Sequence, residues 1–193
     1  MLLENSRESA RLGRRTPAYD YIVPGQWQGK YRTLKVIGDK RGGLSTRYLG
    51  GNPSLIDKLR RTVGVKVLYL HVIRNPYDNI ATMSRKRPDK NLEKAAENYF
   101  GLSRRMTTIR EHVDSADRLD TRHEELIEDP KGCLTRYCRF LGLDAPPDYL
   151  EACAGIVYKS PHQSRHSVEW TPALLDAVAR EIDQRPYLKG YTF

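Results

Sequence analysis

The longest apolar pattern of this 193-residue chain lies in residues 65–84, which read VKVLYLHVIRNPYDNIATMS. A run with few polar interruptions ends abruptly at RNP, residues 74–76, and a helical pattern begins directly after the proline. This pattern predicts a buried strand over 65–73 and a helix over 76–86, with Pro76 suited to the first helical turn. Polar side chains are therefore expected at the carboxyl edge of the strand, where α/β proteins bind ligands.

The same reasoning predicts the remaining elements and an α/β fold with a parallel sheet. A strand, a helix and a second strand in succession form a βαβ unit, whose two strands are parallel. Apolar residues at three- and four-residue steps indicate the long helix. The further predicted elements are strands over 33–37 and 117–122, and helices over 53–61 (Asn52 as cap), 91–113, 131–141 (Gly142 just after its end), from Pro146, and over 172–184 (Thr171 as cap).

The length suits one domain, residues 1–193. Residues 1–32 are expected to be a lead-in and an aromatic loop, and residues 33–193 an α/β core with C-terminal helices. The segment 16–32 holds two prolines, two glycines, three tyrosines and Trp27. It fits either a strap packed on the core or one wall of an acceptor-substrate site.

Composition points to an ordinary globular protein, with 30% charged and 39% hydrophobic residues. No apolar run approaches the length of a membrane span, and the N-terminus has no signal-peptide core. The three cysteines, Cys133, Cys138 and Cys153, lack a metal-ligand spacing. They are expected to be free thiols in a reducing compartment, which makes the cytoplasm the default location.

The net charge of +9 favours a polyanionic partner. Nucleic acid, a phosphorylated nucleotide and an anionic membrane surface all fit a basic protein. Charge alone does not choose among them, and basic clusters such as residues 85–87 also suit solvated helix faces.

Arg74 and Thr82 are the first candidate binding residues. Arg74 stands at the strand end, and Thr82 follows it by eight positions, about two helical turns further on. A guanidinium and a hydroxyl facing one phosphate make a good anion clamp, since arginine offers a planar, permanently charged fork. The alternative is a plain strand-to-helix turn with a surface arginine.

A glycine-rich loop with two cations, GDKRGG at residues 38–43, follows the first predicted strand. Glycines let backbone N–H groups approach phosphate oxygens closely, and Lys40 would then reach the same group. Asp39 is the nearest carboxylate that suits a local base. No Gly-Lys-Ser/Thr ends this loop, so it is not a Walker motif, and a plain surface turn also fits.

A late loop ahead of the last helix gathers Lys159, His162, Arg165 and His166. Its cations suit an anionic ligand. The two histidines lie four apart but in a loop without a third ligand, so no metal is expected.

The segment VIRNPYDNIAT, residues 72–82, resembles the 3′-phosphate-binding segment of the sulfotransferases that use PAPS (3′-phosphoadenosine 5′-phosphosulfate). This resemblance implies that Arg74 and Thr82 hold the 3′-phosphate of the nucleotide. Residues 123–143, HEELIEDPKGCLTRYCRFLGL, resemble a second segment of the same family that serves mainly as scaffold. By the same resemblance, Lys40 acts at the bridging oxygen or sulfonyl group.

The late loop resembles the family's basic loop over the nucleotide, although the Arg-Lys-Gly pattern of the small-molecule enzymes is absent. The resemblance therefore adds Arg165 and Lys159 as further 3′-phosphate ligands. It covers roughly residues 20–193. The family's N-terminal loop around the 5′-phosphosulfate, similar to Pro-Arg-Ser-Gly-Thr-Thr, has no counterpart in the sequence.

The resemblance implies a three-layer sandwich with a central parallel sheet, the P-loop NTPase-like sulfotransferase fold, here N-terminally incomplete. The implied reaction is sulfuryl transfer from PAPS, without a metal, to the hydroxyl or amine of a small-molecule, carbohydrate or protein acceptor. With the 5′ loop missing, little or no turnover is expected.

Two other functions stay open. The chain is either a nucleotide-binding remnant without catalysis or a basic nucleic-acid-binding protein, although no known nucleic-acid motif appears. A nucleotide kinase would need a Walker loop. The sequence indicates neither the acceptor nor the oligomeric state.

Overall fold

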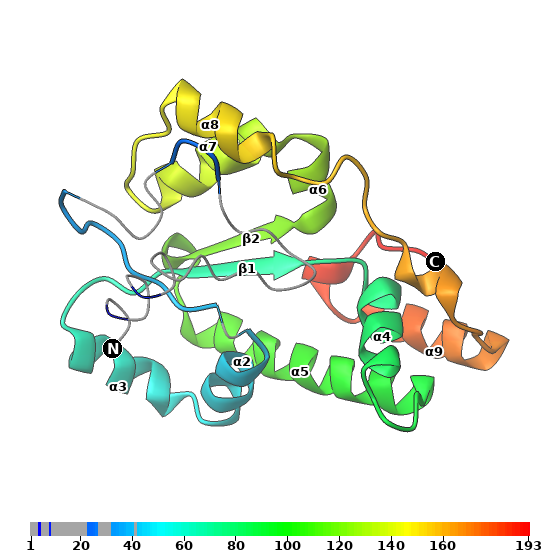
Figure 1. The fold of residues 1–193 in the computed structure, drawn as a ribbon. Helices are drawn as coiled ribbons and strands as arrows, with labels where there is room; N and C mark the ends of the chain where they lie inside the picture. Colours follow the sequence, from blue (N-terminus) through cyan, green and yellow to red (C-terminus); the bar gives the residue numbers. More distant parts are fainter. Residues whose placement is uncertain (1–3, 5–7, 9–22, 27–31, 41) are drawn as a thin grey trace. The chain divides into compact units, whose positions relative to one another are not determined.

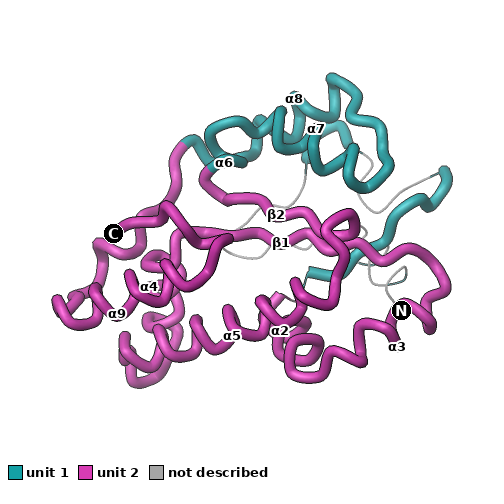
Figure 2. The backbone as a smooth tube through the Cα atoms, turned by 180° about the vertical axis from the view of Figure 1, so that it is seen from behind, with its two compact units in different colours: residues 1–40, 125–159 teal, residues 41–124, 160–193 magenta. Residues whose placement is uncertain are grey.

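A computed structural model describes residues 4, 8, 23–26, 32–40 and 42–193 (Figure 1). The chain divides into two compact units (Figure 2). Unit 1 comprises residues 1–40 and 125–159, and unit 2 comprises residues 41–124 and 160–193. Most of the expected lead-in and aromatic loop, residues 1–32, lies outside the described residues. The prediction of one domain over the whole chain stays a prediction.

Unit 2 contains the sheet and most of the helices. Its elements are α2 (Gly42–Gly51), α3 (Ser54–Val63), β1 (Tyr69–Ile73), α4 (Pro76–Arg85), α5 (Leu92–His112), β2 (Arg118–Arg122), α9 (Pro172–Asp183) and the short 3-10 helices η1 (Ser115–Asp117), η2 (Ser164–Ser167) and η3 (Pro186–Leu188). Helix α6 (His123–Glu128) begins in unit 2 and continues in unit 1, which also holds α7 (Pro130–Phe140) and α8 (Pro147–Ala154).

The two described strands are parallel and in register from Tyr69 opposite Arg118 to Ile73 opposite Arg122. The chain crosses from β1 to β2 through α4 and α5, as a parallel pair requires. Both strands therefore end at one sheet edge. Arg74 follows β1 there, and His123 follows β2.

The core of unit 2 lies on one face of this sheet. Ile73 packs with buried residues of α4, α5 and α9, including Ile80, Phe100 and Val178. Leu70 and Val72, which alternate with the inward residues of β1, are 45% and 56% exposed. A three-layer sandwich needs helices over both faces, and unit 2 by itself covers one. The α/β class is confirmed, but the three-layer arrangement is not.

Most predicted elements are confirmed to within a few residues. Gly142 stands just after α7 with φ +68°, and Thr171 caps α9 by accepting a hydrogen bond from the Leu174 backbone N–H at 3.2 Å. The prediction of Asn52 as a cap is wrong, because Pro53 occupies the cap position of α3 without a side-chain bond.

The predicted strand over 33–37 is wrong, because residues 34–40 are irregular. Leu34, Val36 and Ile37 are exposed, and no described strand pairs with them. An apolar, β-branched segment becomes a strand only where a neighbouring edge accepts its hydrogen bonds. The predicted strand over 65–73 likewise forms only from Tyr69, opposite a five-residue partner.

Helix α2 was not predicted, since its sequence GGLSTRYLGG begins and ends with glycines. Tertiary contact explains it. A Cβ atom added at Gly50 would lie 2.4 Å from the carbonyl oxygen of Arg105, so glycine permits α2 to approach α5 this closely. The packing offsets a helix cost of about 1 kcal/mol per interior glycine.

A charged network joins the sheet to α5. Asp120 on β2 accepts hydrogen bonds from Arg110 Nη1 at 2.5 and 2.6 Å, and His71 Nδ1 lies 3.0 Å from the same carboxylate. Burial alone would raise the pKa of Asp120, but hydrogen bonds from His71 and Arg110 lower it to about 2 from 3.8.

We expect this carboxylate to make unfolding strongly pH-dependent in acid. Because its pKa is lower in the folded state, its stabilisation is complete above about pH 4 and is lost as the pH falls towards about 2. Chemical denaturation should therefore show wild type more stable than Asp120→Asn at neutral pH, with the gap closing over that range. Asp114→Asn, at an exposed site without such bonds, is the control. A gap for Asp120→Asn that stays constant would contradict the assignment.

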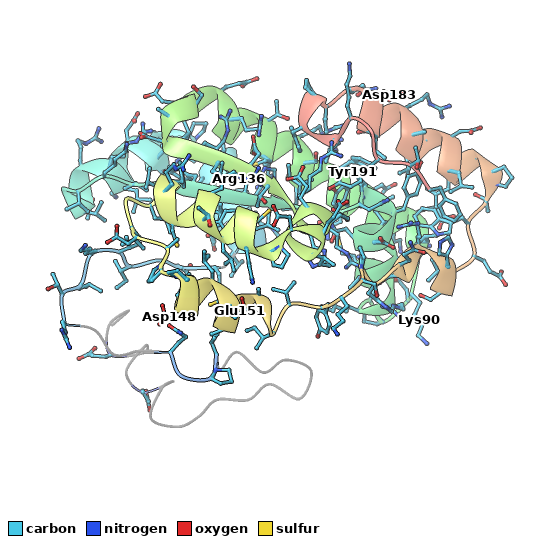
Figure 3. The ribbon with its side chains drawn as sticks, turned by 90° about the horizontal axis from the view of Figure 1, so that it is seen from above. Lys90, Arg136, Asp148, Glu151, Asp183 and Tyr191 are labelled. Carbon is cyan, nitrogen blue, oxygen red and sulfur yellow. The ribbon has the colours of Figure 1, made fainter. Side chains whose placement is uncertain are left out.

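Unit 1 contains a pair of packed helices, α7 and α8. Lys131 and Glu151 form an ion pair between them, and Arg136 lies 3.2 Å from Glu125. Figure 3 labels Arg136 and Glu151 on their helices. All three cysteines are free thiols. In the described part of the chain, no helix is both long and apolar enough to cross a membrane.

Candidate functional site

The site begins at the junction of β1 and α4. Asn75 caps α4 by accepting a hydrogen bond from the Tyr77 N–H at 3.0 Å, and Pro76 occupies the first turn as predicted. The Asn75 N–H donates to Glu124 Oε1 at 2.9 Å, while Tyr191 donates its hydroxyl to Glu124 Oε2 at 2.8 Å. Glu124, which follows β2, thus bonds to the backbone just after β1. This contact fixes the backbone next to Arg74 at the carboxyl edge of the sheet.

Arg74 and Thr82 meet at a third residue, Ser164 on η2. Arg74 Nη2 donates to Ser164 Oγ at 3.2 Å, and Thr82 Oγ1 donates to the same oxygen at 3.2 Å. Arg74 Nη2 also donates to the His162 carbonyl. Ser164 accepts both side-chain bonds, which leaves its own O–H proton as a further donor. The Ser164 hydroxyl therefore bridges Arg74 and Thr82, the two residues that the sequence analysis paired.

A buried ion pair fixes η2 against α4. Asp78, 1% exposed, accepts hydrogen bonds from the Arg165 backbone N–H at 2.9 Å and from Arg165 Nη1 at 2.7 Å. Trp170 Nε1 donates to the Arg165 carbonyl at 2.9 Å. We call the Asp78–Arg165 pair the clasp. Because Arg165 is adjacent to Ser164, the clasp places the Ser164 hydroxyl beside α4.

Three buried nitrogens near this edge have no hydrogen-bond partner among the described residues: Arg74 Nε, Arg165 Nε and His123 Nδ1. Burial lowers the pKa of His123, and the charge of Arg74 lowers it further against the opposing effect of Glu124. Buried polar groups are normally paired, so these three nitrogens have hydrogen-bonding capacity that the described residues do not use.

The structure brings together three of the six predicted site residues. Arg74, Thr82 and Arg165 belong to unit 2 and lie around Ser164, although the Arg165 guanidinium is paired with Asp78. Asp39, Lys40 and Lys159 belong to unit 1, and their roles stay predictions. Sequence reasoning missed Ser164 and Asp78, which contact the three residues of unit 2 directly. The described residues contain no cluster of three metal-ligating side chains.

Among solved structures, this chain is similar to the sulfotransferase domain from the curacin biosynthetic pathway. The two share 16% identity with a TM-score of 0.50, over 71% of this chain and 59% of that one. This chain therefore spans less than two thirds of that domain. No protein-family model and no curated protein matches the sequence. At this identity the likeness shows the fold alone, so it supports a sulfotransferase-like α/β fold, while the three-layer arrangement and the missing N-terminal loop stay predictions.

Proposed function

We propose that this protein binds the 3′-phosphate of PAPS through Arg74 and Thr82 and transfers its sulfuryl group to an acceptor hydroxyl or amine. The observation that carries the proposal is the convergence of these two side chains on Ser164, at the carboxyl edge of a parallel strand. The Arg74 guanidinium adds a permanent positive charge at this edge, and its Nε has no partner among the described residues. The sulfotransferase-like fold supports the same assignment.

In this proposal the 3′-phosphate does not react; its binding, away from the reacting group, positions the sulfur for the reaction. The acceptor oxygen or nitrogen attacks sulfur as the bond from sulfur to the bridging oxygen breaks. The nucleotide leaves as adenosine 3′,5′-bisphosphate, and Lys40 stabilises the negative charge on that oxygen. Asp39 takes the acceptor proton. Arg165 is paired with Asp78, so its part is to hold Ser164 beside α4. Lys159 stays a predicted further ligand of the 3′-phosphate.

Binding without turnover is the second candidate, since the residues at Ser164 suit the 3′-phosphate whether or not the sulfuryl end is held. A sulfate-transfer assay with PAPS separates the two functions. Turnover would establish a sulfotransferase, whereas nucleotide binding with no turnover would favour the non-catalytic remnant.

Adenosine 3′,5′-bisphosphate should raise the melting temperature, because a ligand that binds only the folded chain stabilises it. At about 100 times the dissociation constant, the gain is about 2.7 kcal/mol, or about 5–10 °C for a chain of this length. Adenosine 5′-monophosphate, which lacks the 3′-phosphate, should give a much smaller shift at the same concentration. Equal shifts from both nucleotides, or none from the bisphosphate, would contradict the proposed phosphate site.

A further inference from the structure

Residues 189–193, which follow η3, contact the chain at the ends of both strands, and the nucleotide proposal gives them no role. Arg122, the last residue of β2, donates a hydrogen bond from Nη2 to the Lys189 carbonyl at 2.5 Å. Asn75, at the start of α4, donates from Nδ2 to the Thr192 carbonyl at 2.8 Å. All of these residues belong to unit 2, and we call 189–193 the edge segment.

The middle of the edge segment presents Tyr191 to the site in a fixed orientation (Figure 3). Gly190 just before it has φ +90°, a backbone conformation that residues with a Cβ atom rarely adopt. The Arg122 guanidinium lies 4.5 Å from the centroid of the Tyr191 ring, so a cation covers one face of the phenol. The glycine turn and this cation together direct the hydroxyl to Glu124.

Glu124 carries the contact from Tyr191 to the backbone at the start of α4. Its Oε2 accepts the Tyr191 hydroxyl at 2.8 Å, and its Oε1 accepts the Asn75 N–H at 2.9 Å. Each carboxylate oxygen thus has its own donor, and the two bonds fix the plane of the carboxylate. Burial raises the pKa of Tyr191, and the bond to Glu124 raises it further, so the hydroxyl stays a donor at neutral pH.

The last residue of the edge segment contacts the other side of the site. The Phe193 ring packs edge to face on Tyr77 of α4, with 5.4 Å between centroids, and on His166 of η2, with 5.5 Å. Helix η2 also carries Ser164, whose hydroxyl bonds to residues on both sides. The edge segment therefore contacts both parts of the chain that meet at this hydroxyl.

We propose that Tyr191 is a positioning residue of the phosphate site, acting through Glu124 to orient Arg74 towards Ser164. The Asn75 N–H belongs to the peptide unit that joins Asn75 to Arg74, so a bond that holds this N–H also sets the direction of the Arg74 side chain. The inference rests on the proposed binding of a 3′-phosphate by Arg74. Remote groups that fix such geometry contribute to binding and turnover without touching the ligand.

Tyr187 provides a matched control for the loss of a buried-side hydroxyl. Both tyrosines are half-buried and pack against the same core cluster of unit 2. The Tyr187 hydroxyl donates to the carbonyl of Ser103 on α5 at 2.9 Å, and no hydrogen bond among the described residues joins it to Glu124. Tyr187→Phe therefore removes the same group from the same core and leaves the Glu124 contact intact.

The first measurement is titration calorimetry with adenosine 3′,5′-bisphosphate and with adenosine 5′-monophosphate, since the ratio of the two affinities isolates the 3′-phosphate. Tyr191→Phe should lower this ratio about five- to tenfold, because the phosphate loses part of a charge-assisted bond to a misdirected arginine. Tyr187→Phe should change it less than about twofold, because a general loss of stability does not favour one nucleotide over the other.

Two Glu124 variants test whether Tyr191 acts through this carboxylate. Glu124→Gln still accepts from the Asn75 N–H and still bonds to the Tyr191 oxygen, so it should keep most of the affinity ratio. In a Glu124→Ala background, Tyr191→Phe should have no further effect on the ratio, because the residue that transmits it is gone.

Hydrogen exchange measured by NMR without nucleotide tests the contact on its own. In Tyr191→Phe the Asn75 N–H should exchange about fivefold faster or more, relative to the Ile80 N–H in the middle of α4. Tyr187→Phe should leave this exchange ratio unchanged, since any global loss of stability affects both amides.

Equal exchange ratios in the two tyrosine variants would overturn the inference. So would an unchanged affinity ratio in Tyr191→Phe when wild type binds the bisphosphate. If wild type does not bind the bisphosphate while the exchange ratios differ as expected, the nucleotide proposal fails, and Tyr191 is still established as the residue that holds the Asn75 backbone.

Discussion

Replacing Arg74 with alanine is expected to weaken the binding of adenosine 3′,5′-bisphosphate about 30- to 100-fold. The guanidinium stands at the strand edge with one buried donor unpaired and one nitrogen on Ser164. A charge-assisted hydrogen bond contributes about 1.5–3 kcal/mol, and a phosphate bound by the fork would lose at least one such bond. Titration calorimetry with the purified variant measures the change directly.

Two matched variants make the Arg74 result interpretable. Arg85→Ala removes an exposed arginine from the last turn of the same helix, α4, and should change affinity by less than about threefold. Arg74→Lys keeps the charge but loses the fork, so it should fall between alanine and wild type. An Arg74→Ala protein that is folded by circular dichroism and binds as tightly as Arg85→Ala would refute the clamp.

Local sequence signals predicted the part of the candidate site that lies at the junction of β1 and α4. The ends of β1 and α4 are specified within a few residues of Pro76, by an apolar run, a cap and a proline. Arg74 directly precedes this junction and Thr82 lies about two helical turns further on, so their sequence spacing follows from local structure. That the two residues hold one anion stays a prediction.

The other half of the site is nonlocal, and no period or motif reveals it. Ser164 lies 90 residues from Arg74 and 82 from Thr82, yet its hydroxyl joins them. Asp78 is an ordinary acidic residue in the first turn of a helix, where a dipole contact with the helix N-terminus explains it as well as a buried ion pair does. A single sequence gives no distance between α4 and η2, so the clasp could not be predicted.

The same limit explains the errors in secondary structure. The segment 33–37 has strand propensity but finds no partner among the described residues, while α2 has poor helix propensity but packs closely on α5. In the described part of the chain, residues 33–37 lack the neighbouring strand that their propensity would need, whereas packing against α5 stabilises α2 despite its glycines. In both cases tertiary contacts decide the structure and not the local preference. The long helix α5 was predicted nearly to the residue, because its periodicity runs over 21 residues.

The clasp itself leads to the largest expected effect on stability. Asp78→Ala should lower the free energy of unfolding by about 3–5 kcal/mol, because it leaves the buried Arg165 guanidinium without its counterion. The melting temperature should fall by about 6–20 °C. The variant should also bind adenosine 3′,5′-bisphosphate more weakly where it remains folded, since Ser164 is no longer held beside Arg74.

Two comparisons separate this effect from a general loss of charge. Asp89→Ala removes an exposed carboxylate that also pairs with an arginine, and it should lower the free energy of unfolding far less than Asp78→Ala does. Asp78→Leu combined with Arg165→Met removes both charges, so it should recover much of the stability lost in Asp78→Ala. It should not recover nucleotide affinity, because the backbone N–H of residue 165 still lacks its carboxylate partner. Equal costs for Asp78→Ala and Asp89→Ala would show that the buried pair does not hold η2 to α4.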